Sequence, residues 1–407
     1  MSGPLSGVRI VDMTSVLMGP YATQIMGDMG ADIIKVESPA GDTTRGIGPM
    51  RHPGMGPIFL MANRSKRSIV LDLKAPKGRA ALLDLARTAD VLIYNVRPQA
   101  MARLGLSYDE VRAVNPRIIY VGVFGYGQDG PYAKKPAYDD LIQAAVAVPW
   151  LVAQADKGEP RYVPATMIDR SVGLNAVNVV TAALFHRERH GGEGQAIDVP
   201  MFETMAQFVL GDHMGGRVFD PPLGPAGYAR LLARERRPYR TSDGYICTLI
   251  YSDRQWQSFF SVIGKSEMFE TDPRFRDISV RTRHIDECYA FVAEALLTRT
   301  TAEWYAALEA ADIPVMPMHS LDELIDDPHL AAVGFFRKAE HPTEGAIIDM
   351  AVPSRWSATE PRPERYAPRL GEQSIEVLRE AGYDAAAIEK MIAEGVTIDG
   401  RAEAASN

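Results

Sequence analysis

The sequence predicts an α/β protein with a mostly parallel sheet and a second, smaller domain. One observation behind this prediction is the alternation of short apolar runs with helical segments over the N-terminal half of the chain. The other is a change of composition between Gly211 and Arg240, where glycine, proline and arginine crowd together. The length of 407 residues and the hydrophobic content of 46% suit two or three domains with sizeable cores.

The elements of the large domain follow one another as strand, helix, strand. Short apolar runs predict strands at residues 8–13, 31–37, 68–73, 90–95, 117–124 and 195–199. Helical patterns predict helices at residues 18–29, 76–88, 99–104, 108–114, 169–189 and 201–210. Strands that alternate with helices at this spacing predict right-handed βαβ units and a parallel sheet.

The second domain begins after the change of composition. Asp243-Gly244 precedes an apolar run, which predicts a hairpin there. Helical stretches are expected after this run and through residues 304–311, then a strand at 315–318, followed by a helix from Ser320. Two strands around residues 343–345 and a helical tail at 374–392 complete the expected elements.

The composition excludes several classes of function. The net charge is −8 without long blocks of like charge, so the sequence predicts neither a nucleic-acid surface nor a basic membrane-binding arm. Cys247 and Cys288 stand in no metal-ligand spacing, and we expect no structural metal and no disulfide framework. The N-terminus has no secretory pattern and no segment approaches a membrane span, so we expect a cytoplasmic protein.

Three local patterns suggest binding sites. Residues 125–130, Gly-Tyr-Gly-Gln-Asp-Gly, follow a predicted strand and match a dinucleotide fingerprint, but prolines and lysines intervene before any helix can begin. The methionine-rich N-terminal third is typical of core packing, with an adaptable acyl pocket as the alternative. Arg64, Lys66, Arg67 and Lys74 flank a predicted strand and suggest either an anion site or a solvated loop.

Asp169 is the strongest candidate for chemistry. It follows an extended run and opens a long apolar segment, which places its carboxylate at a helix N-terminus. There the free N–H groups and the helix dipole favour the ionised, nucleophilic form. An ordinary helix N-cap has the same local pattern, so both interpretations stay open on this stretch alone.

Taken together, the motifs resemble the class III CoA-transferase family, also called CaiB–BaiF. The longest is Gly-Ala-Asp-Ile-Ile-Lys-Val-Glu at residues 30–37. The others lie at residues 11–12, 19–20, 22–24, 41–42, 45, 63–64, 66–74, 89–91, 95, 97–98, 103–105, 115–117, 125–132, 243–245, 272–275 and 327–330. The resemblance covers nearly the whole chain and is highly specific.

The resemblance implies a Rossmann-like large domain built from both chain ends, a smaller inserted domain, and an interlocked homodimer. We therefore expect the large domain at residues 1–220, the small domain at 225–335, and a C-terminal segment at 336–407 that returns to the large domain. No tightly bound cofactor is implied, because coenzyme A esters and carboxylic acids are the substrates.

The resemblance also implies roles for individual residues. Asp169 matches the family's catalytic aspartate, which forms an acyl anhydride and then an aspartyl-CoA thioester. The adenine end of coenzyme A would lie against Val70, Leu71 and Asp72. The other expected coenzyme A contacts are Lys74, Asn95, Val96, Arg97 and Arg103 for the nucleotide and phosphates, and Val16 and Met201 for the inner pocket.

Departures from the pattern bear on the substrate. Formyl-CoA:oxalate transferases of this family have histidine and glutamine where this chain has Ser15 and Leu17, and a glycine run that residues 224–227, ending in Gly227, match only partly. These departures argue against oxalate. The family's racemases have a His-Asp pair where this chain has Tyr138-Asp139, and a phenol is a poorer base than an imidazole near neutral pH. Tyr138, Asp139 and Gly227 are therefore candidates for support of the site, with a racemase or a non-catalytic binder of coenzyme A esters as alternatives.

Overall fold

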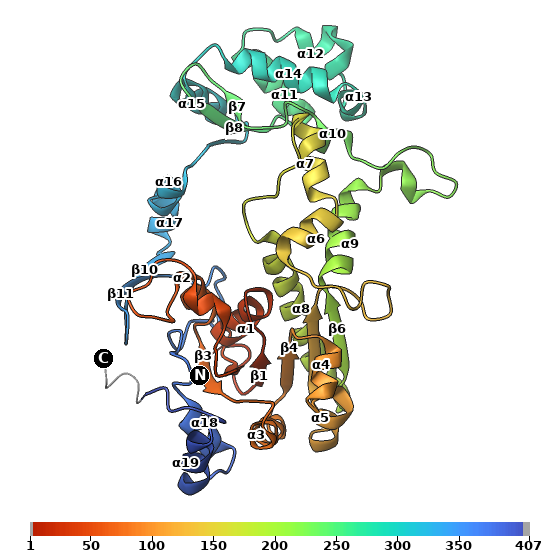
Figure 1. The fold of residues 1–407 in the computed structure, drawn as a ribbon. Coiled ribbons are helices and arrows are strands. Elements are labelled where there is room, and N and C mark those ends of the chain that lie inside the picture. The colour runs from red at the N-terminus through yellow and green to blue at the C-terminus, as the bar shows by residue number, and fades with distance from the viewer. Residues whose placement is uncertain (1–2, 402–407) are drawn as a thin grey trace. The chain divides into compact units, whose positions relative to one another are not determined.

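The structure is a computed structural model that describes residues 3–401 (Figure 1). The chain divides into two compact units. The first contains residues 1–145, 164–206 and 328–407, and the second contains residues 146–163 and 207–327. The bounds differ from the expected domains because residues 146–163 and 207–220 belong to the second unit and residues 328–335 to the first.

A six-stranded parallel sheet forms the centre of the first unit, as the sequence predicts. The strands are β1 (Arg9–Met13), β2 (Asp32–Glu37), β3 (Lys66–Val70), β4 (Val91–Tyr94), β5 (Ile119–Phe124) and β6 (Ala196–Pro200). Their order is β3-β2-β1-β4-β5-β6, and every neighbouring pair is parallel. This is the strand order of the doubly wound dinucleotide-binding fold, which reverses direction between β1 and β4.

Helices connect the strands and cover the sheet. They are α1 (Met18–Asp28), α2 (Pro57–Ala62), α3 (Pro76–Ala86), α4 (Pro98–Arg103), α5 (Tyr108–Val114), α6 (Asp139–Ala145) and α8 (Met167–His190), with α9 (Met201–His213) after β6. Helix α1 packs against α8. Three of these helices begin with proline at the first turn, where its missing N–H costs nothing and its φ suits a helix: α2, α3 and α4.

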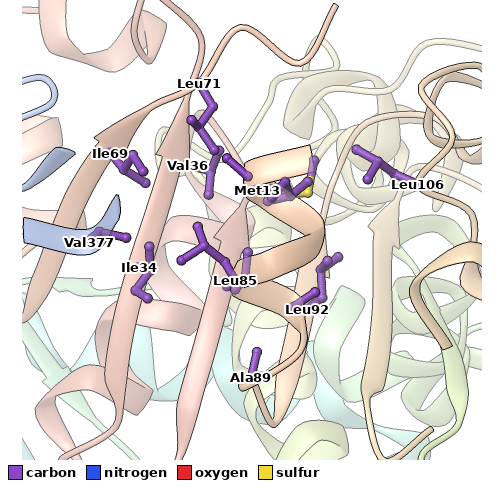
Figure 2. Packing of buried hydrophobic residues seen from close by; sticks show 14 of the residues in the cluster. Met13, Ile34, Val36, Ile69, Leu71, Leu85, Ala89, Leu92, Leu106 and Val377 are labelled. Carbon is purple, nitrogen blue, oxygen red and sulfur yellow. The ribbon is translucent and has the colours of Figure 1, made fainter. Parts of the chain in front are cut away.

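The buried core on one side of the sheet joins distant parts of the chain (Figure 2). Ile34, Ile69 and Leu92 come from three strands, Leu85 from α3 and Val377 from the C-terminal segment. Apolar side chains removed from water in this way supply most of the driving force for folding. The strands β4 and β5 read as continuous apolar runs because both faces of the sheet are covered there.

The C-terminal segment returns to the outer strand of the sheet. It contains α17 (Pro328–Ala332), the hairpin β10 (Phe336–His341) and β11 (Gly345–Met350), α18 (Ser374–Glu380) and α19 (Ala385–Ala393). The Gln373 N–H donates to the Ser68 carbonyl at 2.9 Å, and the Val70 N–H donates to Ser374 Oγ at 3.2 Å. Figure 1 shows α18 and α19 in blue. Gly382, with φ 94°, separates these helices where the sequence predicted one helical tail.

The second unit is built from short helices around a small antiparallel sheet. Its strands are β7 (Tyr239–Arg240), β8 (Tyr245–Thr248) and β9 (Val315–Pro317), in the order β7-β8-β9. Its helices are α7 (Val148–Asp156), α10 (Ala229–Leu232), α11 (Asp253–Val262), α12 (Met268–Thr271), α13 (Ile278–Arg283), α14 (Ile285–Leu296), α15 (Thr301–Ala310) and α16 (Leu321–Ile325). The expected hairpin at Asp243-Gly244 is confirmed. Over residues 3–401, no helix has the length and apolar character that crossing a membrane requires.

Candidate active site

A cavity of about 260 Å³ opens at the carboxyl ends of β1, β4 and β5. Open α/β sheets bind ligands at this edge, where the strand order reverses. The cavity is lined by Ser15, Val16, Leu17, Met18, Asn95, Val96, Arg97, Pro98, Val123, Phe124, Gly125, Tyr126, Gln128, Ala133, Lys135, Pro136, Ala137, Tyr138, Asp169 and Met201. All of these residues belong to the first unit.

Asn95 joins the two loops at the reversal of strand order. Its side-chain Oδ1 accepts the Ser15 N–H at 3.1 Å, and its Nδ2 donates to the Ser15 carbonyl at 2.7 Å. The loop after β1 is thereby tied to the loop after β4 through both backbone groups of one residue. Asn95 thus shapes the cavity through Ser15, and it also lines the cavity, where the resemblance implies a coenzyme A contact.

Asp169 lies in the first turn of α8 but does not cap the helix. The N-cap is Thr166, and Asp169 is the third helical residue. The cap comes from Asp139, whose Oδ2 accepts the N–H of Ile168 at 2.8 Å and that of Asp169 at 3.0 Å. Within residues 3–401, the Asp169 carboxylate receives no hydrogen bond. The N-cap interpretation of Asp169 is therefore wrong, and the carboxylate is free for a ligand.

Burial raises the pKa of the Asp169 carboxyl to about 6, and the neighbouring negative charge of Asp139 adds to the rise, while Arg170 acts in the opposite direction. Loss of solvation disfavours the charged form, and so does a like charge. The net direction is opposite to the one expected from the helix N-terminus alone. At pH 7 the carboxylate is still roughly nine-tenths ionised, so the nucleophilic form dominates.

Two cations reach the same cavity. Arg97 is expected from the resemblance, and it lines the cavity directly after β4. Lys135 is not among the expected residues, and its ammonium group lies 3.8 Å from the centroid of the Tyr132 ring. The pair Lys134-Lys135 was visible in the sequence only as an interruption of the glycine motif. Two cations beside an anionic nucleophile suit a ligand that carries negative charge.

A second hollow, also of about 260 Å³, lies beyond β3 and is basic. It is lined by Leu73, Lys74, Ala75, Pro76, Arg79, Arg103 and Leu104. The resemblance implies Lys74 and Arg103 as contacts of the nucleotide and its phosphates, and the structure brings them together with Arg79, which was missed. Within residues 3–401, none of the three cations has an ion-pair partner within 4.0 Å. Unpaired cations around one hollow are suited to phosphate groups.

Val70, Leu71 and Asp72 lie beside this hollow but offer little surface. Val70 and Leu71 are 0% and 1% exposed. The Val70 carbonyl accepts the Thr397 hydroxyl at 2.7 Å, and the Asp72 N–H donates to the Val396 carbonyl at 2.8 Å. Side-chain contact between an adenine and Val70 or Leu71 is therefore incompatible with this structure, and Asp72 alone of the three keeps partial exposure.

The basic residues before β3 are internal, which corrects the suggestion of an anion site or a solvated loop. Arg64 pairs with Asp28 at 2.8 Å, Lys66 with Asp12 at 3.2 Å, and Arg67 with Asp32 at 2.6 Å. They stand before or at the start of β3, at the edge opposite the cavity. The partners of these residues are remote in sequence, so no local pattern could identify the three ion pairs.

The remaining expected residues divide between different places. Met201 and Tyr138 line the cavity, and Tyr138 is 67% exposed. Gly227 belongs to the second unit, where its φ is 121°. Among the six methionines in question, Met18 lines the cavity and Met26 is fully buried in the core. Met50, Met55 and Met61 line a separate apolar hollow, and Met29 lines neither.

The glycine motif is part of the cavity wall and not a dinucleotide loop. Gly125, Tyr126 and Gln128 line the cavity. After β5 ends at Phe124, the next helix is α6, which begins at Asp139. The predicted absence of a helix directly behind the motif is confirmed, and a pyrophosphate would meet no helix N-terminus there.

Comparison with known proteins gives one consistent result. The family model described as CoA-transferase family III matches residues 5–374. A succinate–glutarate CoA-transferase from Agrobacterium fabrum is 33% identical over 93% of this chain and 95% of its own length. An acetyl-CoA:oxalate CoA-transferase from Acetobacter aceti is 34% identical over 93% of this chain and 96% of its own. The crystal structure of a CaiB/BaiF family protein from Brucella suis has a TM-score of 0.78 at 29% identity, covering 94% of this chain and all of that one.

Proposed function

The chain belongs to CoA-transferase family III, and on this premise we propose that it moves coenzyme A from an acyl-CoA to a carboxylic acid with Asp169 as the nucleophile. The observation that carries the proposal is the position of the Asp169 carboxylate. It lines the cavity at the reversal point of the sheet and receives no hydrogen bond within residues 3–401. A carboxylate without donors keeps its electron pairs available for attack on a carbonyl carbon.

The proposed reaction has two symmetric halves. The Asp169 carboxylate attacks the thioester carbonyl, which forms a mixed anhydride and releases the coenzyme A thiolate. The thiolate attacks the aspartyl carbonyl, which forms an aspartyl-CoA thioester and releases the donor acid. The acceptor carboxylate then attacks this thioester and again releases the thiolate. The thiolate finally attacks the acyl carbonyl of the new anhydride, which yields the new acyl-CoA and restores the Asp169 carboxylate.

The role of Asp139 favours this reaction over racemisation. A racemase needs two groups that exchange protons with the α-carbon. Here both oxygens of Asp139 are engaged, because Oδ2 accepts two backbone N–H groups and Oδ1 accepts the Gln143 amide at 2.6 Å. An acid whose oxygens hold a helix terminus is poorly placed to shuttle protons.

The cations supply a rationale for binding coenzyme A. The basic hollow formed by Lys74, Arg79 and Arg103 suits the phosphates of the nucleotide end, and Arg97 and Lys135 in the cavity suit the pyrophosphate or an acceptor carboxylate. Charge-assisted hydrogen bonds contribute about 1.5–3 kcal/mol each, so this number of cations is ample for a polyanionic cofactor.

The names of the relatives suggest candidate substrates for this chain. One relative is named for succinate and glutarate, and another for acetyl-CoA and oxalate. Ser15 and Leu17 in the cavity leave the wall after β1 less polar than a small dicarboxylate such as oxalate requires. We therefore place longer carboxylic acids ahead of oxalate as acceptors.

The test is a matrix of donors and acceptors. Succinyl-CoA, acetyl-CoA and formyl-CoA are each combined with glutarate, succinate and oxalate, and the new thioester is measured by liquid chromatography. We expect transfer with at least one pair for the wild type and none for Asp169→Ala. Full transfer by Asp169→Ala would contradict the mechanism, and transfer to oxalate alone would contradict the substrate proposal.

We also infer that the chain forms an intertwined homodimer. Leu174 and Phe185, three helical turns apart on α8, are 53% and 67% exposed in the single chain. Large apolar side chains gathered on one helix face favour burial against another chain. Light scattering after size-exclusion chromatography should give twice the mass of 44.7 kDa, and a monomer at micromolar concentration would contradict the inference.

A further inference from the structure

The backbone of Val16 adopts a left-handed conformation in the wall of the cavity. Its φ is 69°, a region that β-branched residues rarely occupy because the side chain crowds the backbone. Val16 lines the cavity that contains Asp169, and it is 37% exposed. A conformation of this kind persists only where surrounding groups hold it, and such sites cluster where ligands bind.

Buried side chains hold this loop through its backbone. The Val16 N–H donates to Asp42 Oδ1 at 3.2 Å, and the Thr14 carbonyl accepts Lys35 Nζ at 2.9 Å. Asn95 binds both backbone groups of Ser15, as described above. Four of the six polar backbone groups of residues 14–16 are therefore bound by a side chain from another segment, and Asp12 binds the Thr14 N–H.

Lys35 and Asp42 form one ion pair at the centre of this arrangement. Lys35 Nζ lies 2.9 Å from Asp42 Oδ2, and each side chain is 1% exposed. Asp42 Oδ1 also accepts the Thr44 N–H at 3.0 Å and the Thr44 hydroxyl at 2.8 Å. Burial acts to raise the pKa of Asp42, but the charge of Lys35 and these hydrogen bonds outweigh it, and the net shift is downward. The Asp42 carboxylate is thus ionised at neutral pH.

Other charges surround the pair and are already matched. Asp12 pairs with Lys66 at 3.2 Å, and Glu37 pairs with Arg45 at 2.6 Å. A buried ion pair is a poor means of stabilising a fold, because desolvation of both charges offsets their attraction. Its better attested use is to fix one conformation among several. Asp42 accepts the backbone N–H of Val16, so the conformation that the pair can fix directly is the strained turn at Val16.

We propose that Lys35 and Asp42 are positioning residues for CoA transfer, which hold the Val16 turn in its left-handed conformation and so fix one wall of the substrate cavity. The proposal rests on the proposed function for its kinetic part, but not for its binding part. Without the pair, the Val16 turn relaxes toward an ordinary conformation and the wall moves relative to Asp169. Displacements of about 1 Å in a site can cost a hundredfold in rate.

The test is a double-mutant cycle that joins Asp42→Asn with Val16→Gly. Glycine adopts a left-handed φ without strain, so Val16→Gly reduces the need for the support that the Lys35–Asp42 pair gives to the turn. We expect Asp42→Asn alone to weaken binding of free coenzyme A, measured by calorimetry, and to lower kcat/KM by about tenfold or more. In the Val16→Gly background the same change should cost less than about threefold, because the two effects are coupled.

A matched control separates positioning from general stability. Asp28 and Arg64 form another buried ion pair, at 2.8 Å, that makes no contact with residues 14–16. The double variant Asp28→Asn/Arg64→Met should lower the melting temperature without changing affinity for coenzyme A. If Asp42→Asn does not fold, Lys35→Met/Asp42→Asn removes both charges and avoids an unpaired buried lysine.

Each outcome decides the proposal. An equal effect of Asp42→Asn in both Val16 backgrounds would overturn it, and so would unchanged binding and kcat/KM in a folded Lys35→Met/Asp42→Asn variant. Because calorimetry needs no turnover, the binding cycle stands even if no donor and acceptor pair reacts. Failure of the proposed transfer reaction is thereby distinguished from failure of the positioning role.

Discussion

The Asp139 carboxylate accepts the backbone N–H of Asp169 at 3.0 Å, so one acid caps the helix on which the other acid is exposed to the cavity. The arrangement has two consequences. Asp139 fixes the backbone from which the Asp169 side chain projects, and its negative charge raises the pKa of Asp169. Position and basicity of the nucleophile are therefore linked through one side chain.

The variant Asp139→Asn tests this link through the pH profile of kcat/KM. The wild-type rate should rise with pH through an apparent pKa of about 6, because the ionised form of Asp169 attacks. Asparagine keeps an oxygen that accepts the two N–H groups but removes the charge. We expect the apparent pKa to move to lower pH, by less than the distance from 6 to 3.8, because burial is the larger cause. An unchanged profile would show that Asp139 acts through geometry alone.

The variant Asp169→Asn is expected to stabilise the fold at neutral pH. The folded pKa of Asp169 is about 6 and its ordinary value is 3.8, so the folded state favours the protonated form. The folded state therefore loses stability as the pH rises from 3.8 to about 6, and the loss persists above pH 6. Asparagine removes the penalty, by about 1–3 kcal/mol at pH 7.5. Thermal unfolding at pH 7.5 and pH 4.5 should show a gain that shrinks at the lower pH, and a destabilised variant at pH 7.5 would contradict this.

Binding of coenzyme A should depend on the basic hollow. Lys74→Ala, Arg79→Ala and Arg103→Ala should each weaken binding by roughly tenfold to a hundredfold, because each removes a charge-assisted bond to phosphate. Lys77→Ala is the control, since Lys77 lies on α3 together with Arg79 but is paired with Glu394. Calorimetry measures the affinities and thermal unfolding the stability. Unchanged affinity in all three variants would indicate that Arg97 and Lys135 bind the phosphates instead.

Exchange of the α-proton separates transfer from racemisation. A 2-methylacyl-CoA incubated in deuterium oxide without an acceptor acid should gain no deuterium, because Asp139 is held by three hydrogen bonds and Tyr138 is 67% exposed. Mass spectrometry of the recovered thioester provides the measurement. Deuterium at the α-position at a rate near turnover would favour the racemase.

Most of the parallel sheet could be predicted from the sequence. The runs are continuous and apolar in β4 and β5, where both faces of the sheet are covered. The largest displacement is in β3, which begins at Lys66 and not at 68. Helix α7 was missed, and residues 146–163 were placed in the large domain. A short helix between two larger segments carries no local signal of the unit to which it belongs.

The candidate site was predicted through residues whose signal is local or part of a family motif. Asp169 opens a long helix, and Arg97 and Asn95 follow a strand, so the sequence places them at the right edge of the sheet. The Asp139 cap on α8 spans 30 positions, and the partners of Lys35 and Arg64 are also set by the tertiary fold. Such pairings depend on packing, which no periodicity in the sequence encodes.

Asp169 should carry a covalent acyl intermediate during the reaction, and chemical trapping of that intermediate is the decisive experiment. The wild type is incubated with a reactive acyl-CoA, treated with hydroxylamine, digested and analysed by peptide mass spectrometry. We expect a hydroxamate on Asp169 of the wild type, and no modification at that position in Asp169→Asn. A hydroxamate on another residue, or full transferase activity in Asp169→Asn without any trapped adduct, would contradict it.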